Sequence, residues 1–358
     1  MVSRALSFPQ CILPPHILAH IATQGPAELR ELAIQALQFD HTIRTSRLTF
    51  SLLGGLQVRH DAAVAAPQAQ PHKKRTIYDA QRGQTLPGHL ARAEGQAPSA
   101  DKAVNEAYDG LGNTFDFYLT TYHRNSIDNA GLALVASVHY GQKYDNAFWN
   151  GQQMVFGDGD GVLFTGFTGV VDVIGHELTH GVTGSEANLT YQGQPGALNE
   201  SISDVFGSLV KQFALKQSVA QADWLIGAGI LAPGIHGTAL RSMKNPGTAY
   251  DDPKIGKDPQ PADMAHYVHT TSDNGGVHIN SGIPNRAFYL AASNLGGFAW
   301  DKAGRIWYDT LCDHSLKSSA NFAAFASLTV RHAALLYGTG SVEQKAVVDA
   351  WQKVGVLK

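Results

Sequence analysis

Gly175-His176-Glu177-Leu178-Thr179-His180, near the middle of the chain, is the stretch on which the interpretation of the whole sequence depends. An α-helix has about 3.6 residues per turn, so two histidines four positions apart lie on one face and can bind the same metal ion. Glu177 projects beside that face, where a carboxylate can take a proton from a water molecule held by the metal, the role that this motif assigns to its glutamate. The stretch therefore predicts a zinc-binding helix with hydrolytic chemistry.

A third protein ligand is expected, because open zinc sites usually have three and leave the fourth position to water. Glu200 is the candidate, since it stands at the start of an amphipathic helix predicted over residues 198–213. Asp204 lies one turn further on the same face and can accept the second ring N–H of a ligating histidine. The alternative is a helix with two ordinary surface histidines, which the mostly apolar flanking positions disfavour. These positions are Val170, Val171, Val173, Ile174 and Leu178.

Length and composition exclude several classes of protein. The 358 residues suffice for two packed lobes and a leader, and 44% hydrophobic residues, 16% charged residues and a net charge of -3 are typical of a globular protein. Nucleic acid is not an expected partner, because no basic stripe is present. No apolar run approaches the roughly 18 residues that cross a bilayer, so no membrane span is expected.

The N-terminal part predicts a leader followed by a linker. Residues 26–39 show helical spacing of apolar residues, and residues 62–70 are rich in Ala, Gln and Pro. Lys73, Lys74 and Arg75 follow, so this stretch is either a processing site or a solvated spacer. Prolines interrupt the first 19 residues, which therefore lack the apolar core of a secretory signal.

The rest of the chain divides into a strand-rich part and a helical part. Short apolar runs between turn residues predict strands up to about residue 169, including 76–78 and 134–140. Gly157 to Gly161 is interpreted as a tight turn rather than a calcium loop, because Val162 and Leu163 stand where further oxygen ligands are required. Helical spacing dominates after Leu198. Pro284 is expected to start one helix, and Ser341 with Gln344 predicts a capping box at the last.

Several of these motifs together resemble the thermolysin-like zinc metalloproteases. The resemblance extends from about Arg75 to the C-terminus, and the leader segment Cys11 to Leu18 is similar to the short propeptide of the protealysin-like branch. The most specific matching stretches are residues 146–151, 157–161, 175–180, 196–204 and 273–282.

The resemblance implies an α+β fold with a β-rich N-terminal lobe, a mainly helical C-terminal lobe and the active-site helix at the cleft between them. The implied organisation is a propeptide over 1–60, a linker or processing region over 61–75, and lobes over 76–190 and 191–358. The chain is expected to be a zymogen whose propeptide inhibits it, with Cys11 a remote candidate to approach the zinc. Most relatives of this family are secreted with a signal, so the resemblance implies secretion. Because no such signal is recognisable here, cytoplasmic retention or another export route stays open.

The resemblance also implies roles for individual residues of a zinc endopeptidase that cleaves before large hydrophobic residues. It places Glu177, Tyr191, His278 and Asp273 in catalysis, and His176, His180 and Glu200 on one zinc ion. It places Asp204 and Asn199 in contact with the zinc ligands rather than with the zinc itself. The substrate would contact Asn146, Ala147, Arg241, Phe164, Phe167, Val173 and Leu240.

Calcium is where the sequence departs from the family pattern. Asp172 and Asp223 match two ligands of a double calcium site, but residues without a carboxylate stand at further ligand positions, namely Lys211, Leu225 and Ala228. Thr238 similarly replaces an acidic ligand of a separate site. Because a lysine is incompatible with a dication, Lys211 is expected to pair with Asp172 or Asp223, and little or no structural calcium is predicted.

Two other functions stay open. A zinc aminopeptidase would need acidic residues that bind a free amine, and no such cluster lies beside the motif. A peptide-binding relative without catalysis would not need Glu177, Tyr191 and His278 together. Both alternatives are therefore less favoured than an endopeptidase acting on proteins or peptides.

Overall fold

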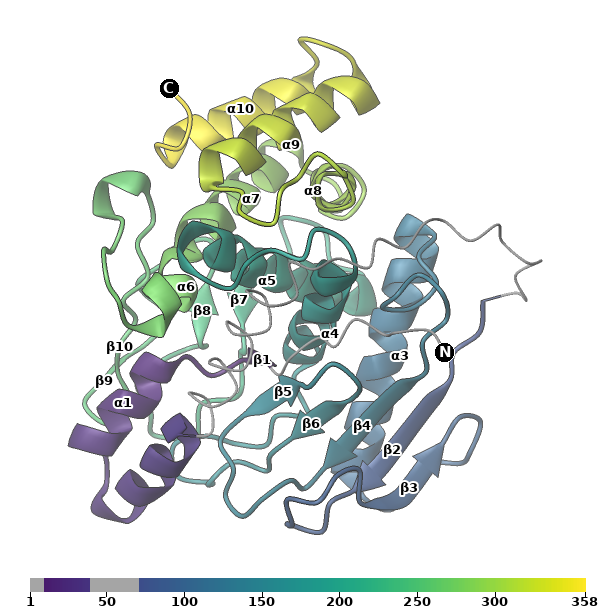
Figure 1. Ribbon diagram of the computed structural model, residues 1–358, viewed down its shortest axis with the longest axis vertical. Coiled ribbons are helices and arrows are strands. Elements are labelled where there is room, and N and C mark those ends of the chain that lie inside the picture. The colour runs from purple at the N-terminus through teal and green to yellow at the C-terminus, as the bar shows by residue number, and fades with distance from the viewer. Residues whose placement is uncertain (1–9, 39–70) are drawn as a thin grey trace.

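The computed structural model describes residues 10–38 and 71–358 (Figure 1). One mixed sheet lies at one end of the molecule, and the last four helices lie at the other, with α4 and α5 between them. This arrangement confirms the expected fold of a strand-rich part joined to a helical part.

The sheet contains six strands in the order β1-β5-β6-β4-β2-β3. Its central pairs, β2 with β4 and β4 with β6, are parallel, and the outer pairs are antiparallel. The strands are β1 (Gln10–Cys11), β2 (Arg75–Asp79), β3 (His89–Ala93), β4 (Leu134–Val138), β5 (Ala147–Trp149) and β6 (Met154–Phe156). The predicted strands at 76–78 and 134–140 correspond to β2 and β4.

Helix α3 (Lys102–Tyr122) packs on β2 and β4. It begins where Asp101 accepts hydrogen bonds from the N–H groups of Ala103 and Val104, which would otherwise lack partners in the first turn. It ends at His123, whose φ of 57° is left-handed and stops the helix. Residues 157–161, where a tight turn is expected, belong to no helix or strand, and Gly159 and Gly161 have positive φ.

Helices α4 (Val171–Ser185) and α5 (Gly193–Leu215) form the centre of the molecule. They cross closely because glycines face each other: a Cβ on Gly175 would lie 3.1 Å from Gly207 Cα. The helix predicted over 198–213 is thus longer than expected, starting five residues earlier. Close approach of these two helices brings the faces that carry His176 and Glu200 together.

The C-terminal part is helical, as predicted. Its helices are α6 (Asp273–Asn280), α7 (Gly282–Leu295), α8 (Ala303–Leu311), α9 (Phe322–Tyr337) and α10 (Val342–Lys353), with a short 3-10 turn η1 (Met264–His266). Two small hairpins join α5 to this lobe: β7 (Leu225–Ile226) with β8 (Arg241–Ser242), and β9 (Asp251–Asp252) with β10 (Gly256–Lys257).

Two helix-start predictions have different outcomes. Pro284, expected to start a helix, lies in the first turn of α7, which begins at Gly282. At α10 the Gln344 N–H donates to Ser341 Oγ at 3.1 Å, as a capping box requires. The Gln344 side chain, however, accepts the N–H of Gly340 rather than that of Ser341.

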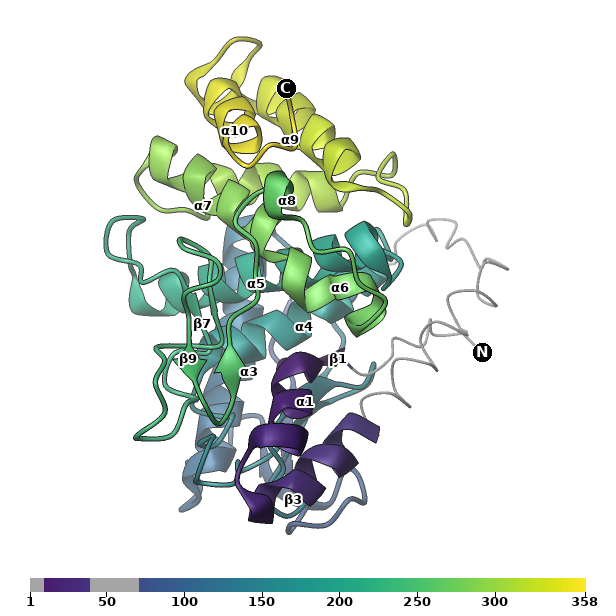
Figure 2. The same ribbon diagram turned by 90° about the vertical axis from the view of Figure 1, so that its left-hand side faces the viewer.

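The leader folds against both lobes (Figure 2). Strand β1 pairs antiparallel with β5, helix α1 (Pro15–Gln24) contacts β10, and residues 27–38 form the second helix that the spacing predicted. Cys11, the remote candidate to approach the zinc, is buried in a small cluster with Phe148 and Tyr140 and pairs with Phe148 in the sheet. Its approach to the zinc stays a prediction.

The basic cluster after the linker is partly built into the fold, whereas the linker itself, residues 62–70, lies outside the described residues. Arg75 is the first residue of β2, is buried, and binds Glu94 through its side chain and its backbone N–H. The sheet therefore starts one residue before the expected boundary at 76. Within residues 10–38 and 71–358, every helix is too short or too polar to cross a bilayer.

Candidate metal centre and active site

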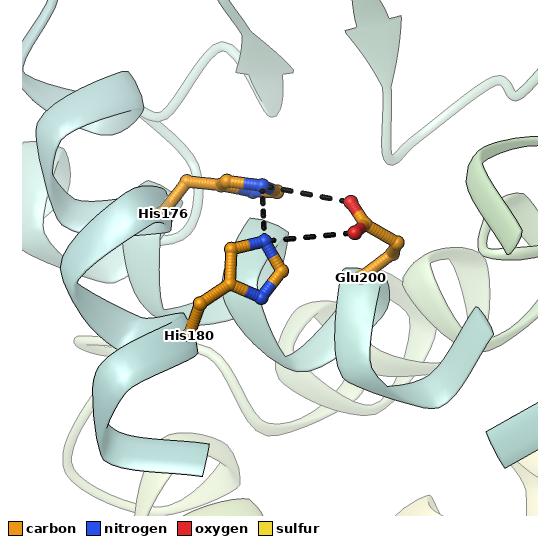
Figure 3. Close-up of side chains that lie close together, drawn as sticks. All are labelled: His176, His180 and Glu200. Carbon is orange, nitrogen blue, oxygen red and sulfur yellow. Dashed lines mark hydrogen bonds and ion pairs between the residues drawn. The ribbon is translucent and has the colours of Figure 1, made fainter. Parts of the chain in front are cut away.

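His176, His180 and Glu200 converge at the crossing of α4 and α5 (Figure 3). The Nε2 atoms of the two histidines are 3.0 Å apart, and they lie 3.6 and 3.5 Å from the Glu200 carboxylate oxygens. All three side chains are buried. The structure thus brings together the three ligands that the sequence predicted from two separate helices.

The Nδ1 atom of each histidine, on the other side of the ring from Nε2, makes a hydrogen bond to another residue. His176 Nδ1 lies 2.8 Å from Asp204 Oδ1, and His180 Nδ1 lies 2.8 Å from Asn199 Oδ1. Because a ring N–H is needed for these bonds, each Nε2 presents its lone pair to the centre of the cluster. Ser203, which sequence reasoning missed, adds a contact of 2.9 Å to His180 Nδ1.

The donor set fits a zinc ion. Two imidazole nitrogens and one carboxylate, all within 4.8 Å of one another, are the ligands of an open catalytic zinc site. Glu200 Oε2 is buried and makes no hydrogen bond, an arrangement that costs free energy unless a cation is bound.

Glu177 lies beside the cluster, on the side of the sheet edge. Its Oε2 accepts the backbone N–H of Trp149 in β5 at 3.1 Å, and its side chain is fully buried. The bond to β5 orients this carboxylate between the metal ligands and the strand where a peptide would lie.

Tyr191, His278 and Asp273 line the other side of the cluster. The Tyr191 hydroxyl donates a short hydrogen bond to Glu200 and lies 3.4 Å from His278 Nε2, which is itself 3.4 Å from Glu200 Oε2. Asp273 binds the His278 ring at Nδ1, at 2.7 Å, and accepts the backbone N–H of the same residue. These contacts place all three predicted residues within reach of one reacting centre.

Arg241 connects the residues behind the metal ligands to the leader. Its Nε and Nη2 donate to the two oxygens of Asp204, each at 2.8 Å. Burial alone would raise the pKa of Asp204, but the charge of Arg241 and the bond to His176 outweigh it, so the pKa of this carboxyl is lowered. Asn285, not predicted from the sequence, donates to Asp204 Oδ2 at 2.8 Å.

The leader occupies the residues that were expected to hold a substrate backbone. Ile12 N–H donates to the Ala147 carbonyl at 3.2 Å, and Leu13 N–H donates to Asn146 Oδ1 at 3.0 Å. Arg241 Nη1 donates to the Ile12 carbonyl at 3.1 Å. A segment of the chain itself thus lies antiparallel to β5, as an added strand would.

The four residues expected to line an apolar pocket belong to the main hydrophobic core. All four are buried, and the same core includes Ile12 and Leu13 of the leader. The four residues are Phe164, Phe167, Val173 and Leu240.

Lys211 makes the ion pairs that its sequence position predicted. Its Nζ donates to Asp172 Oδ2 at 3.1 Å and to Asp223 Oδ2 at 2.7 Å. Burial lowers the pKa of Lys211, but the two carboxylates outweigh burial and raise it. An ammonium group therefore lies between the carboxylates that would otherwise hold a cation.

This fold and this site define a metalloendopeptidase, and sequence comparison shows that the chain belongs to the thermolysin metallopeptidase family. Residues 63–184 match the catalytic domain of that family, and residues 187–356 match its alpha-helical domain. The family uses zinc, and His176, His180 and Glu200 form the corresponding triad.

Individual relatives resemble the chain over nearly its whole length. It is 54% identical to an extracellular metalloprotease of Pectobacterium carotovorum subsp. carotovorum, covering 98% of this chain and 97% of the relative. It is 46% identical to Protease PrtS of Photorhabdus sp. (strain Az29), covering 96% and 91%. The precursor of protealysin, a metalloproteinase from Serratia proteamaculans, matches with a TM-score of 0.86 and 54% identity, covering 97% of this chain and 99% of that structure.

Proposed function

We propose that the chain is a zinc-dependent endopeptidase, made as a zymogen, that hydrolyses peptide bonds on the amino side of large hydrophobic residues. The observation that carries this proposal is the position of the leader. Its backbone binds Asn146, Ala147 and Arg241 beside the cluster of His176, His180 and Glu200, which supports an extended peptide as the substrate.

The mechanism follows from the side chains around the cluster. A zinc ion bound there would supply Lewis acidity, which polarises the scissile carbonyl and makes a water molecule acidic. Glu177, oriented by the Trp149 N–H, takes the proton of the attacking water and delivers it to the leaving amine. Tyr191 and His278 donate hydrogen bonds to the developing oxyanion, and Asp273 orients the His278 ring.

The substrate preference follows from the apolar residues near the edge strand. A side chain that follows the scissile bond would enter the region of Phe167, Val173 and Leu240, where it is removed from water. Burial of a large apolar side chain contributes about 1 to 3 kcal/mol, which corresponds to a discrimination of roughly tenfold to a hundredfold against small residues.

The leader acts as an intramolecular inhibitor in this proposal. It takes the backbone donors and acceptors of β5 that a substrate would need, and Pro14 and Pro15 follow directly after the bound residues. The protealysin precursor, which matches this chain from end to end, is consistent with a precursor form. Activation then requires that the propeptide be released from β5, to which its residues Gln10 and Cys11 pair.

Processing is proposed N-terminal to Arg75, within or near the region 61–75. Cleavage after Arg75 would require its withdrawal from β2 and from Glu94. Lobes over about 75–190 and 191–358 would remain as the mature enzyme. Because relatives are named as extracellular, we propose that the mature enzyme acts outside the cell.

An assay with an internally quenched peptide tests this function. The full chain, before and after leader cleavage, is incubated with a peptide that contains one Leu or Phe, and with a control peptide in which that residue is Asp. We expect chelator-sensitive cleavage on the amino side of Leu or Phe, restored by zinc and greater after leader cleavage. Release of single residues from the peptide N-terminus would indicate an aminopeptidase instead, and an inert, metal-free preparation would contradict the proposal.

A further inference from the structure

The carboxylate of Asp204 is shared by two parts of the active site. One of its oxygens binds the ring of His176, and both bind the guanidinium of Arg241. A carboxylate can accept about four hydrogen bonds, and these contacts supply three. The fourth, at 2.8 Å to Oδ2, comes from Asn285 Nδ2.

Asn285 is built into the fold in a way that points its amide at this carboxylate. It is fully buried in α7, and its backbone N–H donates to the Ser281 carbonyl within the chain. Its Oδ1 is buried without a hydrogen bond. Exchange of the amide N and O would place two acceptors against each other, so the NH₂ group must face Asp204.

The Asp204 carboxylate needs such a contact because its terminal torsion is soft. Rotation about an sp³–sp² bond has broad energy wells, so packing of Cβ alone does not fix the plane of a carboxylate. Arg241 binds both oxygens, and His176 binds Oδ1. Asn285 adds a second donor to Oδ2 from α7, so both oxygens have two partners and rotation of the carboxylate would break several hydrogen bonds at once.

We propose that Asn285 is a positioning residue that fixes the Asp204 carboxylate, and thereby aligns His176 for zinc and Arg241 for a peptide carbonyl. This inference rests on the proposed function of the same site. It assigns to α7 a contribution to metal affinity, although the zinc ligands all come from α4 and α5.

The test uses the full chain and two nearly isosteric variants. Asn285→Leu removes the donor, and Asn285→Asp replaces it with an acceptor beside Asp204. Zinc affinity is measured by competition with a chromogenic chelator, and the docking of the leader is followed by hydrogen exchange of residues 10–18, since Arg241 binds the Ile12 carbonyl. We expect zinc affinity to fall by about tenfold to a hundredfold, and the leader to exchange faster.

A matched control separates positioning from general stability. Trp351 Nε1, in α10, donates a buried hydrogen bond to Thr329 Oγ1, in α9, at 2.9 Å. Thr329→Val removes this bond. The variant is expected to be less stable but to keep the zinc affinity and the leader exchange of the parent. If Asn285→Leu does not fold, Asn285→Ser is compared with the parent by the rise in melting temperature on zinc addition. The inference is overturned if the parent binds zinc and the Asn285 variants bind it equally well, or if Thr329→Val weakens binding as much. A parent chain that binds no zinc would instead contradict the proposed function.

Discussion

Replacement of Lys211 by Met should destabilise the protein more than loss of any surface ion pair. Asp172 is fully buried, and Lys211 Nζ, at 3.1 Å, is the cation beside it. Removal of one partner of a buried pair costs about 3 to 5 kcal/mol, because the other charge is left uncompensated. The second pair, with Asp223, adds little, since that carboxylate is 42% exposed.

The size of this effect should depend on pH. Burial raises the pKa of Asp172 even in the presence of Lys211. In the variant, the folded chain can therefore take up a proton on Asp172 at a pH where the unfolded chain cannot. The deficit relative to the parent should therefore shrink as the pH falls toward 3.8, the ordinary pKa of this carboxyl.

Urea denaturation measures this loss. With a slope of roughly 3 kcal/mol per molar urea, a loss of 3 to 5 kcal/mol lowers the midpoint by about 1 M or somewhat more. The matched control is Lys302→Met, which removes an exposed pair with Glu343 at 2.7 Å and should cost less than about 1 kcal/mol. Equal losses in the two variants, or a parent chain that calcium stabilises, would refute the view that Lys211 replaces a cation.

Three further predictions concern catalysis, pH and the leader. Glu177→Gln should lower peptidase activity by about a hundredfold or more while zinc, measured by elemental analysis, stays bound; unchanged activity would exclude Glu177 as the base. The carboxylates of Asp158 and Asp101, which accept hydrogen bonds from the two ring nitrogens of His139, raise the pKa of His139 from 6.5 to about 9, so its contribution to stability should be full below pH 6.5 and disappear as the pH rises through 9. Urea midpoints of the parent and His139→Gln should therefore converge at alkaline pH, and a constant difference would argue against this assignment. Leu13→Asp places a carboxylate where no water reaches, and the uncleaved chain should then hydrolyse a quenched peptide that the parent leaves intact.

The parts of the fold that could be predicted from the sequence are those specified by local patterns. Ser341 and the apolar run of β4 act within a few residues, so the corresponding elements are recognisable in the chain. The start of α5 was misplaced because residues 193–197 contain two glycines and a proline, which disfavour a helix in isolation. In the folded protein, packing of α5 against α4 overrides that preference.

Among the side chains of the site, too, those set by local helical spacing could be predicted, and those that depend on packing between distant segments could not. His176 and His180 were predictable because one helical turn sets their separation, and Ser203 could have been found by the same rule, since it lies four residues after Asn199. The packing of Cys11 could not be predicted, because strand alternation decides which face a side chain takes, and no sequence pattern showed that β1 pairs with β5. Asn285 binds a carboxylate 81 positions away in sequence. Such contacts depend on how α7 packs on α5, so a residue that positions a metal ligand from a third helix becomes visible only when the packing of the helices is known.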